Sequence, residues 1–187
     1  MKHNSLSHKF IRQPFQRTLN RWGEFPLLVP LFLLLLVCPA FGQGQVWTVD
    51  INNGPGTDFT SVIDAVNSAA NEDVLLIRGG TYTGGTALID GKSLVLSADA
   101  GPKVVLDGLS FKVRNLAADQ SVTFRGLASS IYTPVLVTRF QFMNNAGPIW
   151  MEDCSLYGGN HGGLQALVQV ISCDQVVIER STLWGLR

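Results

Sequence analysis

A short β-rich segment returns four times in this chain at an almost constant spacing, and this repeat limits the possible folds most strongly. Leu94, Val122, Ile149 and Val176 hold equivalent places, 28, 27 and 27 residues apart. A fixed period of this length is typical of a solenoid, in which each repeat stacks on the one before it. The repeat therefore predicts an elongated stack of similar coils.

The composition of each repeat indicates what the coils are made of. A second β-rich stretch returns between the copies, at 111–113, 140–142 and 168–170. Each period thus holds two or more short strands, separated by turns and without a helix. Such coils stack strand on strand at about 4.8 Å. The sequence predicts an all-β fold, a right-handed parallel β-helix of about four to five coils.

The predicted stacking places like residues above one another. Alternation along the strands predicts two inward columns and two outward ones. The inward columns are Leu94, Val122, Ile149, Val176 and Leu96, Phe124, Met151, Ile178; the outward ones are Thr123, Trp150, Val177 and Arg125, Glu152, Glu179. A β-sandwich with accidental self-similarity is the alternative, because regular turns at short spacing also suit a sandwich.

The segment before the repeats differs from them. Apolar residues between Phe59 and Ala70 recur at helical spacing, with Asp58 or Thr60 able to cap the start. We expect this helix to be a short N-terminal cap within residues 46–72, followed by coils over 73–187.

The first 42 residues have the composition of a secretory signal peptide. They carry five basic residues and one acid before an apolar run, Leu27 to Val37, and then small residues at Ala40 and Gly42. We predict cleavage after Gly42 and an exported mature domain, 43–187, in the periplasm, at the cell surface or outside the cell. A retained membrane anchor is the alternative, although eleven helical residues rise only about 16 Å and a hydrocarbon core needs about 30 Å.

Removal of this leader changes the charge of the chain. The whole sequence has 14 basic and 14 acidic residues, and the part after Gly42 keeps 9 and 13, a net charge of −4. An acidic domain without a basic patch is not expected to bind nucleic acid. Two cysteines remain, Cys154 and Cys173, and the sequence allows either a disulfide between them or two small buried side chains.

Three segments resemble a known group of proteins. Residues 58–66 (DFTSVIDAV), 73–82 (DVLLIRGGTY) and 104–108 (VVLDG) are similar to the opening of pectin-lyase-like right-handed β-helix proteins. The resemblance covers roughly residues 46–187. It implies that the helix is an N-terminal cap and that the Gly-Thr-Tyr segment closes the first coil. It says little about activity, because this superfamily includes lyases, hydrolases, esterases, adhesins and binding proteins.

One outward column raises the question of catalysis. Glu152 and Glu179 fall one coil apart, with Arg125 above them. Carboxyl groups about 5–5.5 Å apart suit a retaining glycosidase, so these two glutamates are the catalytic candidates. The alternative is a solvated ladder of charges, with Asp153 and Arg180 paired beside it, which contributes little to stability.

Aromatic residues lie near this column and suggest contact with sugar rings. Trp150 precedes Glu152, and Tyr157 and Trp184 form their own column. Flat aromatic faces suit sugars, but aromatic stacking within the coil is the structural alternative. With Arg125, and His161 in a glycine-rich loop, these are the predicted substrate-binding residues. The sequence offers no set of metal ligands and predicts no cofactor.

Together these observations favour an exported β-helix surface or binding module, with a polysaccharide or cell-surface glycan as its partner. The alternative is a polysaccharide lyase or glycoside hydrolase of pectin-lyase-like type, or a truncated remnant of one. The sequence ends at Arg187 within a coil and without a polar cap. Because repeat arrays need terminal caps, we expect the N-terminal portion of a longer β-helix protein or a truncated gene product. We also expect the exposed C-terminal coil to be able to pair.

Overall fold

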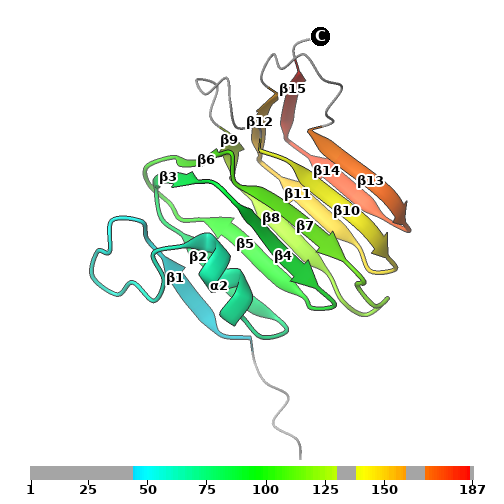
Figure 1. The fold of residues 1–187 in the computed structure, drawn as a ribbon, viewed down its shortest axis with the longest axis horizontal. Coiled ribbons are helices and arrows are strands. Elements are labelled where there is room, and N and C mark those ends of the chain that lie inside the picture. Colours follow the sequence, from blue (N-terminus) through cyan, green and yellow to red (C-terminus); the bar gives the residue numbers. More distant parts are fainter. Residues whose placement is uncertain (1–43, 130–137, 159–166, 186–187) are drawn as a thin grey trace, which may run out of the picture. The chain divides into compact units, whose positions relative to one another are not determined.

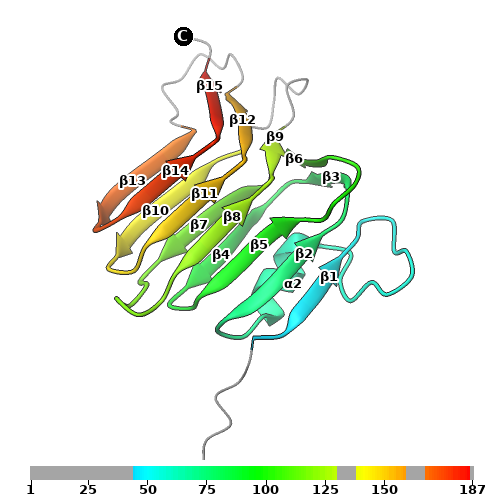
Figure 2. The ribbon, with the colours of Figure 1, turned by 180° about the vertical axis from the view of Figure 1, so that it is seen from behind.

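The computed structural model describes residues 44–129, 138–158 and 167–185, and the statements below concern these residues. The predicted signal peptide lies outside them. Three parallel sheets wind around one core as a β-solenoid of about five turns (Figures 1 and 2). The all-β prediction and the parallel coil stacking are thereby confirmed, and the β-sandwich alternative is excluded.

Each full coil contributes one strand to each sheet, so strands far apart in sequence are neighbours. Sheet A contains β1 (Val46–Val49), β2 (Asp73–Ile77), β5 (Leu94–Ala98), β8 (Val122–Arg125), β11 (Ile149–Glu152) and β14 (Val176–Glu179). Sheet B contains β3 (Gly80–Thr83), β6 (Val104–Asp107), β9 (Ala128–Ser129), β12 (Ser155–Gly158) and β15 (Thr182–Gly185). Sheet C contains β4 (Thr86–Asp90), β7 (Ser110–Arg114), β10 (Phe140–Asn145) and β13 (Val168–Cys173).

The columns predicted from the repeat are in register. Leu94 pairs with Val122, Val122 with Ile149, and Ile149 with Val176. The second inward column is in register in the same way, and its Leu96, Phe124 and Met151 have no exposed surface. The repeat of apolar residues therefore forms the core directly, as parallel in-register stacking requires.

The core contains a cluster of four phenylalanines. Phe111, Phe124, Phe140 and Phe142 are fully buried. Phe124 has ring centroids 5.1 Å from both Phe111 and Phe140, and Phe140 stacks on Phe111 at 5.2 Å. Side chains from sheets A and C meet here and fill the space between the two sheets.

The helix is shorter than predicted and its cap is a different residue. Helix α2 spans Val62–Ser68, and the Ser61 hydroxyl accepts a hydrogen bond from the Asp64 N–H at 3.3 Å. The prediction of Asp58 or Thr60 as cap was wrong. Phe59 is extended and pairs with Val49, while the Asp58 carboxylate accepts from the Thr48 N–H at 2.8 Å. This pairing holds residues 58–59 out of the helix, which then packs on the first coil beside β4 (Figure 1).

A left-handed residue lies at the same place near the end of each strand of sheet C, directly after β4 and β7 and one residue before the end of β10 and β13. Gly91, Asn115, Asn144 and Ser172 have φ values of 60°, 58°, 55° and 52°. Glycine and asparagine tolerate this conformation better than other residues. Serine is therefore the most strained member of this set.

We expect Ser172→Asn to raise the free energy of unfolding by about 0.5–1 kcal/mol, because asparagine relieves left-handed strain. Urea unfolding at constant protein concentration measures the change. The reciprocal substitution Asn144→Ser should lower the same free energy by a similar amount. Equal stability of all three proteins would show that this backbone position carries no strain.

Candidate functional site

Charged side chains form a ladder along the outer face of sheet A. Arg125, Glu152 and Glu179 are in register on three successive strands. Arg125 donates to Oε2 of Glu152 from Nε at 2.9 Å and from Nη2 at 2.6 Å. The Glu152 side chain is only 16% exposed, whereas that of Arg125 is 53% exposed. The carboxylate of Glu152 thus lies close to the sheet, beneath the exposed guanidinium of Arg125.

Arg180 extends this ladder around the corner between sheets A and B. Its Nε lies 2.9 Å from Oδ1 of Asp153, its Nη1 3.5 Å from Glu179 and its Nη2 3.7 Å from Glu152. The hydrogen bond and charge of Arg180 lower the pKa of Asp153, and the hydrogen bond from Arg180 to Asp153 in turn raises the pKa of the guanidinium. We call Arg125, Glu152, Asp153, Glu179 and Arg180 the charged corner.

The backbone of the charged corner explains why two of its residues can meet. Asp153 and Arg180 follow β11 and β14 and have left-handed φ values of 54° and 47°. Gly126, after β8, has the same conformation with a φ of 71°. The turn geometry therefore repeats from coil to coil and points Asp153 and Arg180 to one side.

The contacts at the charged corner bear on the catalytic candidates. A retaining glycosidase needs one carboxylate free to attack and a second carboxyl group to donate a proton. Oε2 of Glu152 accepts two hydrogen bonds from Arg125, and Asp153 pairs with Arg180. These are the ion pairs that the charge-ladder alternative predicts, while catalysis by Glu152 and Glu179 stays a prediction.

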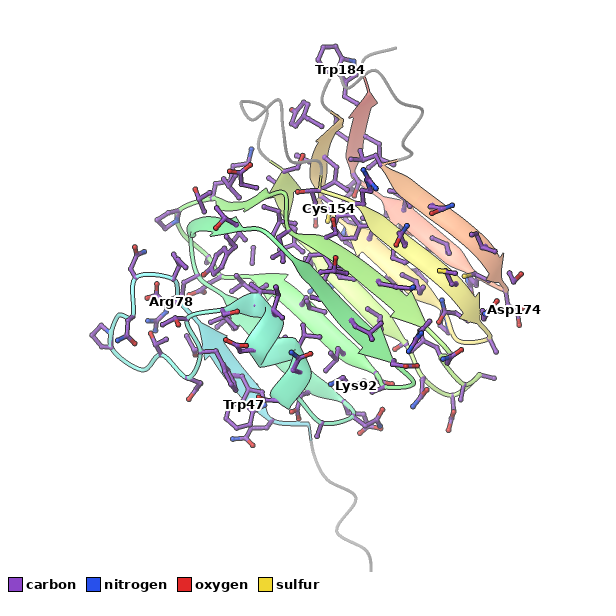
Figure 3. The ribbon with its side chains drawn as sticks, in the orientation of Figure 1. Trp47, Arg78, Lys92, Cys154, Asp174 and Trp184 are labelled. Atoms are coloured by element: carbon purple, nitrogen blue, oxygen red, sulfur yellow. The ribbon has the colours of Figure 1, made fainter. Side chains whose placement is uncertain are left out.

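The predicted aromatic contacts divide into two groups on either side of the charged corner. Trp150 is half-buried on the outer face of sheet A, between Thr123 and Val177 in register. Tyr157 and Trp184 pair on sheet B, with ring centroids 6.3 Å apart and planes at 82°. Trp184 is 57% exposed and projects at the far end of β15 (Figure 3). His161 lies outside the described residues.

The two cysteines do not form a disulfide. Cys154 and Cys173 are both free, and burial raises the pKa of the Cys154 thiol. Cys173 is in register with Asn145, whose Nδ2 lies 3.4 Å from its sulfur. Within the described ranges, no three His, Cys, Asp or Glu side chains gather as metal ligands.

Sequence reasoning missed the buried polar residues of the described ranges, which are Asp50, Asp73, Ser129, Thr138 and Asn145. Asn145 donates to the Val113 carbonyl and accepts from the Leu116 N–H, both at 3.1 Å. Asp73 accepts hydrogen bonds at the start of the solenoid from three donors, among them Trp47. An aspartate at the start of an apolar run is the one signal that could have identified Asp73.

Comparison with known proteins adds no relative to these observations. No family model, no curated protein and no solved structure matches the chain. In the described ranges, the helix found is too short and insufficiently apolar to cross a membrane.

Proposed function

We propose that this protein is an exported binding module that holds a glycan against the outer surface of its last two described coils. The observation that carries the proposal is the aromatic pair of Tyr157 and Trp184, with more than half of Trp184 exposed. An exposed indole beside a second aromatic ring offers a flat face, and a flat aromatic face suits the apolar face of a sugar ring.

The charged corner supports the same proposal through its hydrogen-bonding groups. Arg125 and Arg180 supply exposed donors, while Asp153 and Glu179 supply acceptors with side chains 49% exposed. Sugar hydroxyls both donate and accept, so a site with an apolar face and a few polar groups of both kinds fits them. Trp150 adds a second aromatic surface on sheet A.

The proposed place of the protein among pectin-lyase-like β-helices rests on the segments at 58–66, 73–82 and 104–108. The leader supports export. Neither feature distinguishes a binding module from an enzyme, and the contacts of Glu152 with Arg125 favour the module.

Loss of glycan binding in Trp184→Ala tests the proposal. The protein is expressed from residue 1, so that the expression host can process the leader. The purified product is titrated with polygalacturonate and with an uncharged glucan. We expect at least a tenfold rise in Kd for the glycan that binds, because hot-spot aromatics contribute about 2 kcal/mol or more. Leu88→Ala removes an exposed apolar side chain from sheet C and should leave Kd unchanged.

The same samples separate binding from catalysis. Release of new reducing ends or unsaturated products, abolished by Glu152→Gln, would overturn the module and assign a polysaccharide-active enzyme. Absence of binding to any glycan tested, or equal Kd values for Trp184→Ala and the unsubstituted chain, would also contradict the proposal.

A further inference from the structure

The loop between β1 and Phe59 carries a dipeptide that can react with itself. Asn53 is followed by Gly54, and the sequence has no other asparagine directly before a glycine. Asn53 is exposed and has a left-handed φ of 52°. Because glycine has no Cβ, its amide nitrogen is unhindered and can reach the side chain of a preceding asparagine. The pair at 53–54 is therefore the place in this chain where the backbone can most easily attack an asparagine side chain.

The reaction at such a dipeptide is deamidation. The amide nitrogen of Gly54 loses its proton to a base in the solvent and attacks Cγ of Asn53. A bond between this nitrogen and Cγ forms, the bond between Cγ and Nδ2 breaks, and Nδ2 leaves as ammonia. Water then opens the resulting succinimide at either carbonyl and gives aspartate or isoaspartate. The sum is hydrolysis of one side-chain amide, which consumes water and no other reactant.

Asp50 holds the attacking nitrogen in the folded protein. The Gly54 N–H donates to Oδ2 of Asp50 at 3.1 Å, and Asp50 is only 6% exposed. Hydrogen bonds from the backbone of Asn52 and of Gly54 outweigh burial and lower the pKa of this carboxyl group, so it is ionised at neutral pH. Removal of the Gly54 proton would place a second negative charge against the carboxylate, which like-charge repulsion disfavours. The contact therefore keeps the nitrogen protonated and unreactive.

Further contacts hold the loop around this bond. The Asn53 N–H donates to the Asp50 carbonyl at 3.0 Å, and the Gly54 carbonyl accepts from the Thr57 hydroxyl at 2.6 Å. Arg78 lies beside the loop (Figure 3), and its Nη1 donates to Oδ2 of Asp50 at 3.4 Å. A Cβ at position 54 would lie 2.7 Å from the same oxygen. The glycine that makes the dipeptide reactive is thus also the residue that the contact with Asp50 requires.

We propose that Asn53 is a deamidation site that the hydrogen bond from Gly54 to Asp50 protects while the first loop is folded. The reaction takes place in copies whose loop has opened, so its rate follows the population of the open loop. The site belongs to the first coil and is independent of glycan binding, which involves the last two described coils.

The modification changes the loop permanently. It places a new carboxylate beside that of Asp50, and isoaspartate also adds a methylene group to the backbone. The loop leads from β1 to Phe59, whose N–H donates to the Thr48 carbonyl at 3.1 Å and covers part of the edge of β1. A modified loop cannot restore its original hydrogen bonds, and the edge of β1 is then open to pairing with other strands.

Incubation of the full chain at pH 8 and 37 °C, followed by peptide mass spectrometry, tests the proposal. We expect Asn53 to deamidate about tenfold or more slowly in the folded chain than in the chain unfolded in guanidinium chloride, because the hydrogen bond to a charged acceptor must first open. Asp50→Ala should raise the rate in native buffer toward that of the unfolded chain. Asp58→Ala is the matched control, since its carboxylate accepts from the Thr48 N–H in the same loop, and it should keep the slow rate.

Hydrogen exchange in the unsubstituted chain covers the case in which Asp50→Ala does not fold. The Gly54 amide should be protected, and low concentrations of guanidinium chloride should speed its exchange and the deamidation of Asn53 by the same factor, because both need the same opening. Equal deamidation rates in the folded and unfolded chains, or an unprotected Gly54 amide, would overturn the proposal. So would equal acceleration by Asp50→Ala and Asp58→Ala, or an unfolded chain in which Asn53 does not react.

Discussion

Replacing Phe124 with alanine should lower the free energy of unfolding by about 3–5 kcal/mol, the range for removal of a large buried aromatic side chain. Phe124 has no exposed surface and its ring lies 5.1 Å from those of Phe111 and Phe140 and 6.1 Å from that of Phe142. Its loss leaves a cavity between sheets A and C that strands paired on both sides cannot close by moving inward.

Urea unfolding followed by circular dichroism measures this change. Trp184→Ala is the matched control, because it removes an aromatic side chain of larger volume from an exposed position and should change stability by no more than about 0.5 kcal/mol. A loss below about 1 kcal/mol for Phe124→Ala would mean that the core repacks around the gap. It would contradict close packing of Phe124 against the other three phenylalanine rings.

The position of Phe124 in the core could be predicted because stacking in register converts a sequence period into a spatial column. The same reasoning located Arg125, Glu152 and Glu179 on one outer column and paired Tyr157 with Trp184. In a solenoid, residues one period apart become neighbours whatever the turns between them do. The sequence period therefore predicted which residues of the candidate site become neighbours in the fold.

Features that do not recur with the period could not be predicted in this way. The sheet B strand of one coil, β9, is only two residues long and leaves no alternation to detect. The cap of α2 was misplaced because Phe59 pairs with Val49, a contact that depends on how the first loop folds back. Asp73 accepts hydrogen bonds from Gln45 and Trp47, which lie far from it along the chain, and no sequence pattern marks these donors.

Asp73→Ala should destabilise the N-terminal end by about 2–4 kcal/mol, because it leaves donors to a buried, charged acceptor unsatisfied. Asp73 is 4% exposed. Its Oδ1 accepts from the Gln45 N–H at 2.7 Å, and its Oδ2 accepts from Trp47 Nε1 and from the Ala70 N–H, both at 2.8 Å. These bonds join β1, the end of the α2 segment and β2.

The environment of Asp73 also predicts a dependence on pH. Burial alone would raise its pKa, but the hydrogen bonds from Trp47, Gln45 and Ala70 and the charge of Lys92 outweigh burial and hold the pKa below the ordinary 3.8. A carboxyl group with a lowered folded-state pKa stabilises the fold above its unfolded-state pKa, about 3.9. This contribution is lost as the pH falls through the folded-state value.

Urea midpoints at pH 7 and near pH 3 check both parts of this prediction. The stability difference between the unsubstituted chain and Asp73→Ala should be largest at pH 7 and should shrink in acid, as the remaining carboxylate becomes protonated. Asp119→Ala removes an acid from an exposed turn and should show no comparable loss at either pH. A difference for Asp73→Ala that stays constant down to pH 2 would assign its effect to packing, since the ionised carboxylate and its three donors would then contribute nothing to the attachment of β1.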